Sequence, residues 1–83
     1  MKPTKISSIE SLDEALDNDI HEFFIALGAG RSSKDIYHGE EDGLYEIYNY
    51  IDDTEQVLTK EQLMDEEYTN IGKAIKNGCF YAY

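Results

Sequence analysis

The segment that most constrains the fold is residues 44–51, which read Leu-Tyr-Glu-Ile-Tyr-Asn-Tyr-Ile. Aromatic and β-branched side chains favour extended backbone, so this segment is predicted to form a β-strand. Successive side chains of a strand point to opposite faces, which places Tyr45, Ile47 and Ile51 together. The opposite face would carry Glu46, Tyr48 and Tyr50. One of these sets can pack against helices, and the other must then face solvent or a partner.

The segments before this strand predict a helix, two further strands and their turns. Helical spacing of apolar residues predicts a helix over residues 8–17, with a capping box formed by Ser7 and Glu10. Residues 21–27, with an apolar run from residue 23 to residue 27, predict a central strand. Glycines at 28 and 30 break that run, so we expect a turn at 31–33, a strand at 34–38 and a hairpin loop at 39–43.

The segments after residue 51 predict mostly helix. Residues 55–58 are expected to add only a short extended piece. Thr59 and Gln62 have capping-box spacing, which predicts a brief helix ending at residue 64 or 65. A last helix is expected to begin after residues 68–70 and to stop at Asn77 and Gly78, before a closing strand over residues 79–83.

Together these elements predict one α+β domain spanning residues 1–83. The expected order is αβββααβ, with a mainly antiparallel sheet of about four strands packed by two or three helices. A chain of 83 residues has a thin core, but 41% of its residues are apolar, which is enough for a globular fold. The longest apolar run, residues 23–27, is far too short to span a membrane, and no signal-peptide pattern opens the sequence, so a cytoplasmic location is expected.

Charge is the strongest compositional signal. Eighteen acidic and seven basic residues leave a formal net charge of −11, and Lys60 is the single base between residues 35 and 67. This charge disfavours direct binding to nucleic acid or to an anionic membrane, because both repel it. It favours a basic partner protein, of the kind that normally binds nucleic acid. The alternative is that the acids serve only solubility.

Catalytic and metal-binding patterns are missing from the sequence. Cys79 is the only cysteine, so neither an intramolecular disulfide nor a cysteine-based zinc site is expected. His21 and His38 have no His or Cys nearby in the sequence, and no calcium-loop spacing or nucleophile motif occurs. We therefore predict a non-enzymatic protein with no cofactor and no bound metal.

The sequence offers two candidate binding sites. The first is an acidic, tyrosine-bearing surface for a basic protein, with carboxylates for charge and two tyrosines as anchors. Its predicted residues are Glu40, Glu41, Asp42, Glu46, Tyr48, Tyr50, Asp52 and Asp53. The second is the glycine-bounded turn before the second strand, which could bind an anion although it lacks the P-loop order. Its residues are Arg31, Ser32, Ser33 and Lys34. A further alternative is a self-associating module in which the tyrosine face pairs two copies.

The chain resembles a set of short acidic proteins encoded in phages, prophages and plasmids, a set with no established activity. The resemblance is carried by residues 23–34, an apolar strand followed by a glycine turn and Arg-Ser-Ser-Lys, and by the sequence Ile-Asp-Asp-Thr-Glu-Gln at 51–56. Leu58-Thr59, Leu63, Asn70-Ile71-Gly72 and Ala74-Ile75 extend it. Small acidic proteins of mobile elements include anti-CRISPR proteins, so the resemblance implies an inhibitor or nucleic-acid mimic directed against a nucleic-acid-handling protein.

Overall fold

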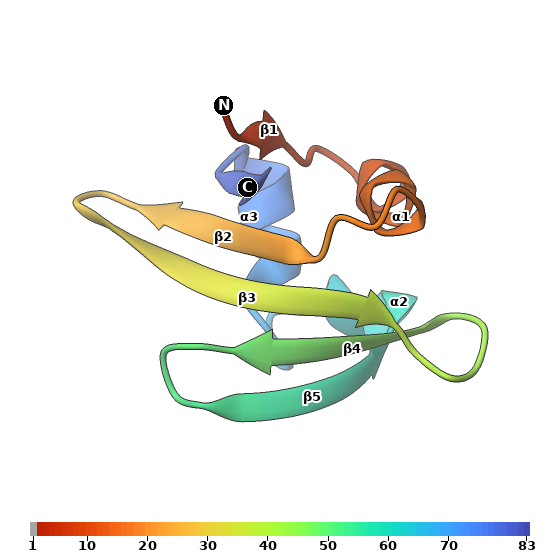
Figure 1. The fold of residues 1–83 in the computed structure, drawn as a ribbon. Helices are drawn as coiled ribbons and strands as arrows, with labels where there is room; N and C mark the ends of the chain where they lie inside the picture. The colour runs from red at the N-terminus through yellow and green to blue at the C-terminus, as the bar shows by residue number, and fades with distance from the viewer. Residues whose placement is uncertain (1) are drawn as a thin grey trace.

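The computed structural model describes residues 2–83 as one antiparallel sheet with helices against it (Figure 1). The sheet has six strands in the order β1-β6-β2-β3-β4-β5, and every neighbouring pair within it is antiparallel. Along residues 2–83 the elements are β1 (Thr4–Lys5), α1 (Ile9–Asp17), β2 (Glu22–Leu27), β3 (Gly30–His38), β4 (Leu44–Asn49), β5 (Thr54–Thr59), α2 (Lys60–Leu63), α3 (Ile71–Asn77) and β6 (Phe80–Ala82).

The helix ends follow local capping chemistry. Ser8, not Ser7, is the N-cap of α1, and its capping box is completed by Ser11 instead of Glu10, so that predicted pairing is wrong. A serine at the third helical position is short enough for its hydroxyl oxygen to accept a hydrogen bond from the Ser8 backbone N–H, with N and Oγ 3.0 Å apart. The predicted capping box of Thr59 and Gln62 is confirmed at the start of α2. Helix α3 ends as predicted at Gly78, whose φ of 73° is the left-handed conformation that glycine accepts.

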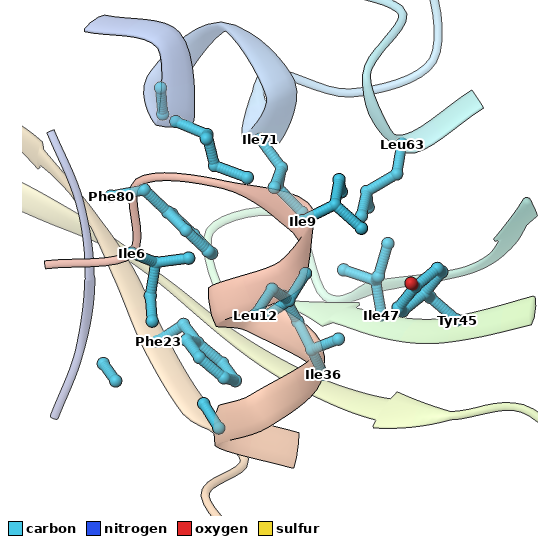
Figure 2. Close-up of a cluster of buried hydrophobic side chains, with 14 of the residues drawn as sticks. Ile6, Ile9, Leu12, Phe23, Ile36, Tyr45, Ile47, Leu63, Ile71 and Phe80 are labelled. Atoms are coloured by element: carbon cyan, nitrogen blue, oxygen red, sulfur yellow. The ribbon is translucent and has the colours of Figure 1, made fainter. Parts of the chain in front are cut away.

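The core lies between the helices and one face of the sheet (Figure 2). Leu12 of α1, Leu63 of α2 and Ile71 of α3 are each 0% exposed and supply its helical side. The strands supply alternate residues: Phe23, Ile25, Ile36, Tyr45, Ile47, Leu58, Phe80 and Ala82. Because these side chains alternate along each strand, the intervening residues project from the other face, which no helix of residues 2–83 covers (Figure 1). We call this the open face.

The predicted order αβββααβ with about four strands is wrong, although the class is α+β. The observed order is βαββββααβ. Strand β1 has only two residues and is held by pairing with β6, so no local pattern marks it. Residues 54–59, expected to be a short extended piece, form the full strand β5 because all six pair with β4.

The turn expected at residues 31–33 is also wrong. Strand β3 already begins at Gly30, and the connection from β2 is only Gly28 and Ala29, since Leu27 pairs with Gly30. Gly28 supplies the left-handed backbone of this hairpin, with φ of 43°. Arg31 to Ser33 are polar, but pairing with β2 satisfies their backbone and overrides their weak strand propensity. Strand β4 ends at Asn49, two residues before the predicted end, because residues 50–53 turn into β5.

Candidate protein-binding face

The centre of the open face is a row of four side chains from four adjacent strands. The strand register places Glu22 opposite Asp35, Asp35 opposite Tyr48, and Tyr48 opposite Glu55. Directly opposed residues share a face, and neighbouring strands lie about 4.8 Å apart, so the row spans about 14 Å. We call these four residues the acidic row. Three carboxylates and one phenol therefore cross the sheet in line.

The residues beside the acidic row add acid and apolar surface. The neighbouring row consists of Tyr37, Glu46 and Val57, in which Glu46 is exposed and Val57 is 60% exposed. Strands β4 and β5 present no basic side chain to the open face, because their outward residues are Leu44, Glu46, Tyr48, Glu55, Val57 and Thr59. This half of the open face is therefore negatively charged, and apolar side chains lie among its carboxylates.

Two tyrosines are held in place by carboxylates. The Tyr50 hydroxyl donates a hydrogen bond to Asp35 Oδ2 at 2.8 Å, and the Tyr48 hydroxyl donates to Asp53 Oδ1. The two rings meet edge to face, with centroids 5.0 Å apart. Each hydrogen bond to a carboxylate raises the pKa of the phenol, chiefly because the protonated form is the donor. Both phenols thus remain neutral donors in the physiological pH range.

Asp35 has unused capacity to accept hydrogen bonds. Its Oδ1 atom is buried and has no hydrogen-bond partner within residues 2–83. Asp35 also lines a surface hollow of about 340 Å³, together with Glu46, Tyr48 and Glu55. A buried carboxylate oxygen without a donor is costly, and a lysine or arginine entering from outside would satisfy it. The hollow therefore has the chemistry of a receptor for a basic side chain.

The opposite end of the open face, near β6, is aromatic and carries a base. The Arg31 guanidinium lies over the Phe24 ring, 4.4 Å from its centroid, and 5.7 Å from the centroid of Tyr83. The Tyr83 hydroxyl is hydrogen-bonded to Ser33 Oγ at 3.0 Å. Phe24 also stacks on Tyr81, with centroids 5.3 Å apart. Arg31 is engaged with these rings, so it does not neutralise the acidic row.

The predicted partner-binding residues occupy three places. Glu46, Tyr48, Tyr50 and Asp53 come together on the open face, as the Tyr48–Asp53 hydrogen bond shows for the last of them. Glu40, Glu41 and Asp42 lie in the β3–β4 loop, at the other end of β4 from Asp52 and Asp53. Six strand residues separate the two ends by about 20 Å. Asp52 accepts a hydrogen bond from Thr54 at 2.7 Å and lines a hollow on the helix side of the sheet.

Glu22, Asp35 and Glu55 were missed because each is an isolated acid in its own strand. Their common feature is alternation relative to inward-facing residues: Glu22 precedes the buried Phe23, Asp35 precedes the buried Ile36, and Glu55 precedes the partly buried Gln56. That alternation would have assigned each one to a face. The register between strands was still needed to bring them into one row.

The four residues predicted to bind an anion do not converge. Because Arg31 to Lys34 lie in a strand, alternate side chains project to opposite faces. Arg31 and Ser33 contact Tyr83 on the open face, whereas Ser32 and Lys34 are buried on the helix side, each 7% exposed. The proposed cradle of four adjacent residues is therefore divided into two pairs.

The remaining candidates for chemistry have structural partners. His21 is hydrogen-bonded through Nδ1 to the Ile36 carbonyl at 3.0 Å and stacks on Tyr37. His38 Nε2 lies 3.0 Å from Asp17 Oδ1 in an exposed pair. Within residues 2–83, no three His, Cys, Asp or Glu side chains converge in a metal-binding arrangement. None of the helices in the same range has the length and apolar character needed to cross a membrane.

Comparison with known proteins adds no assignment. No protein-family model matches the chain, and neither a curated protein nor a solved structure is significantly similar to it. The fold and the open face are therefore the basis for the functional proposal.

Proposed function

We propose that this chain is a non-enzymatic binding protein whose open face docks a basic, nucleic-acid-handling protein. The observation that carries the proposal is the acidic row, with the unpartnered Asp35 Oδ1 at its centre. An arginine or lysine of the partner would donate to that oxygen. Glu22 lies beside Asp35 in the same row and Glu55 lies beyond Tyr48, and both would receive further basic side chains.

The charge distribution supports a partner that normally binds nucleic acid. Carboxylates fixed along a rigid sheet present a regular series of negative charges, which is also what a nucleic-acid-binding groove recognises in a phosphate backbone. A net charge of −11 would also accelerate diffusional encounter with a basic groove. In this role the protein would act as an inhibitor or nucleic-acid mimic of the anti-defence type, by analogy in size and charge with small acidic proteins of mobile elements.

The exposed tyrosines supply the apolar part of the contact. Tyr50 is 52% exposed and Tyr48 is half-buried, and both are oriented by hydrogen bonds before any partner arrives. Ordered aromatic side chains lose little conformational freedom on binding, so they contribute efficiently to affinity. Val57 extends this apolar surface towards the edge of the sheet.

Charge reversal on and off the open face tests the proposal. The double variant Glu46→Lys/Glu55→Lys should capture less than about a tenth of the basic protein that the unaltered chain captures, because two attractive contacts become repulsive. The matched control Glu14→Lys/Glu67→Lys changes the net charge equally at exposed positions on α1 and in the α2–α3 connection. The assay is capture from lysate over a series of salt concentrations, with duplex DNA as competitor.

The results separate the proposal from simple charge attraction. We expect the captured protein to be basic, to be displaced by DNA and to be retained by the control variant. Equal loss of binding in both double variants would mean that overall charge is responsible, which would overturn the role of the open face. Capture that is indifferent to salt and to DNA would overturn the nucleic-acid-like docking.

Self-association is a second candidate function, favoured by the two ends of the open face. One end carries Arg31 with Phe24, and the other carries Glu46 of β4 and Glu55 of β5, so two copies stacked face to face in opposite directions would place opposite charges together. Sedimentation over a range of concentrations distinguishes the two. A tight dimer that is lost on Arg31→Gln would favour this candidate, whereas a monomer at all concentrations would exclude it.

A further inference from the structure

The helix side of the sheet buries a lysine without a counter-ion. Lys34 is 7% exposed, and no carboxylate of residues 2–83 lies within salt-bridge distance of its Nζ. Its partners are neutral: Nζ donates to Asn49 Oδ1 at 2.6 Å and to Ser32 Oγ at 3.4 Å. An ammonium group has three donors, so one has no acceptor in the described chain. Buried charges are normally paired, which makes this arrangement unusual.

A directed chain of hydrogen bonds leads from Lys34 to the surface. Asn49 accepts from Lys34 and donates through Nδ2 to Thr54 Oγ1 at 3.3 Å, and Thr54 in turn donates to Asp52 Oδ1 at 2.7 Å. Each group therefore points its donor away from the cation and towards the anion. Gln56 accepts a second hydrogen bond from Asn49 at 3.1 Å and donates to the Tyr68 carbonyl. This network fixes the lysine and its neighbours in one orientation.

A polar hollow opens beside this network. It has a volume of about 460 Å³ and is lined by Lys34, Ser32 and Asn49 on the strands and by Thr69 and Asn70 from the α2–α3 connection. We infer that this hollow binds the carboxylate group of a small monoanionic ligand. The carboxylate would accept the unused Lys34 proton, and its charge would replace the missing counter-ion. This inference does not depend on the proposed function, since the hollow and the acidic row lie on opposite faces of the sheet.

The charges around the hollow select a monoanion over a dianion. Lys34 is the only cation among its lining residues, and Asp52 also lines it. Lys34 would attract either ligand and Asp52 would repel it. A carboxylate has a single charge, which matches the one cation and is repelled less by Asp52 than the double charge of a phosphate dianion. Burial lowers the pKa of Lys34, and the negative charge of Asp52 opposes this effect. A bound carboxylate would raise that pKa again.

The test is an NMR titration of the isotopically labelled protein with sodium acetate at neutral pH, against sodium chloride at equal ionic strength. We expect saturable shifts at the Lys34 amide and the Asn49 side-chain amide. Lys34→Met should weaken acetate binding at least about tenfold, because it removes the charged donor. Lys73→Met is the matched control, since it removes the same charge from a lysine that is 63% exposed on α3, and it should bind acetate as the unaltered chain does.

A second variant keeps the test decisive if Lys34→Met does not fold. Asp52→Asn changes an exposed turn residue and should tighten acetate binding about threefold, because a like charge is removed from the rim. Unchanged acetate affinity in Asp52→Asn, or equal binding in Lys34→Met and Lys73→Met, would overturn the inference. So would shifts that follow chloride as closely as acetate, or tighter binding of inorganic phosphate than of acetate.

Discussion

Lys34 and Asp35 are adjacent in the chain, yet they lie on opposite faces of the sheet and in opposite electrostatic situations. Asp35 belongs to a surface where several carboxylates share solvent and one of its oxygens remains without a partner. Lys34 is enclosed by neutral groups beneath the α2–α3 connection, and its hydrogen bonds connect it to Asp52 through Asn49 and Thr54. The carboxylates of the open face are thus accessible to a partner, whereas the Lys34 charge on the helix side is fixed in place by a network of hydrogen bonds.

The difference shows how one strand can serve both stability and binding. On the helix side, apolar residues are almost fully enclosed, so packing there determines whether the chain folds. On the open face, large side chains such as Tyr50 and Val57 remain more than half exposed, so they contribute little to folding. Substitutions of these exposed side chains should therefore change binding without changing the fold, and substitutions in the core on the helix side should do the reverse.

The largest expected effect is on the helix side. Leu12 of α1 is 0% exposed, and Leu12→Ala should lower the free energy of unfolding by about 3 kcal/mol, through lost burial and the cavity left behind. Val57→Ala on the open face removes a side chain that is 60% exposed and should cost less than about 0.5 kcal/mol. Urea denaturation measures both. Similar losses for the two variants would contradict the division between the faces.

Much of this division was predictable from β4 alone. The alternation of Tyr45 and Ile47 with Glu46 and Tyr48 assigned the two faces correctly, because one buried face forces a two-residue period. Ile51 did not follow its predicted face and is 70% exposed, since the strand ends at Asn49. The Asp52–Asp53 turn explains this early end: Asp53 has φ of 56°, a conformation that breaks the strand.

The features that could not be predicted from the sequence depend on contacts between residues that are distant in the chain. Glu22, Asp35 and Glu55 form a row only because the β2–β3 and β4–β5 registers align them, and a wrong turn at residues 31–33 hid the first register. Lys34 stands in a polar stretch, and nothing local indicates that it is buried. Its burial follows from β2 and β4 on either side and from the α2–α3 connection, which Gln56 holds through the Tyr68 carbonyl.

A smaller effect is expected at a buried tyrosine on the helix side. Tyr45 is 4% exposed on the helix side and donates to Asp13 Oδ1 at 2.6 Å, so Tyr45→Phe should cost about 1 kcal/mol near neutral pH. Burial, reinforced by the Asp13 hydrogen bond, raises the pKa of Tyr45. Urea denaturation of the variant and the unaltered chain at neutral pH measures the loss.

The same substitution has a signed pH dependence. The folded state keeps the Tyr45 proton above pH 10, where the unfolded state releases it, so this contribution is complete below about pH 10 and is lost as the pH rises further. Tyr45→Phe should therefore reduce the loss of stability between about pH 10 and pH 11. A steeper alkaline loss in the variant would contradict the assigned role of the phenol.

The most direct test of the account is to map where a basic ligand binds. A short oligolysine peptide titrated into the isotopically labelled protein should shift the amides of Asp35, Glu46, Tyr48 and Glu55, and the shifts should disappear as salt is added. The amides of α1 and α3 should remain unchanged, because those helices cover the other face. Shifts centred on α1, or distributed evenly over the molecule, would contradict a binding surface on the open face.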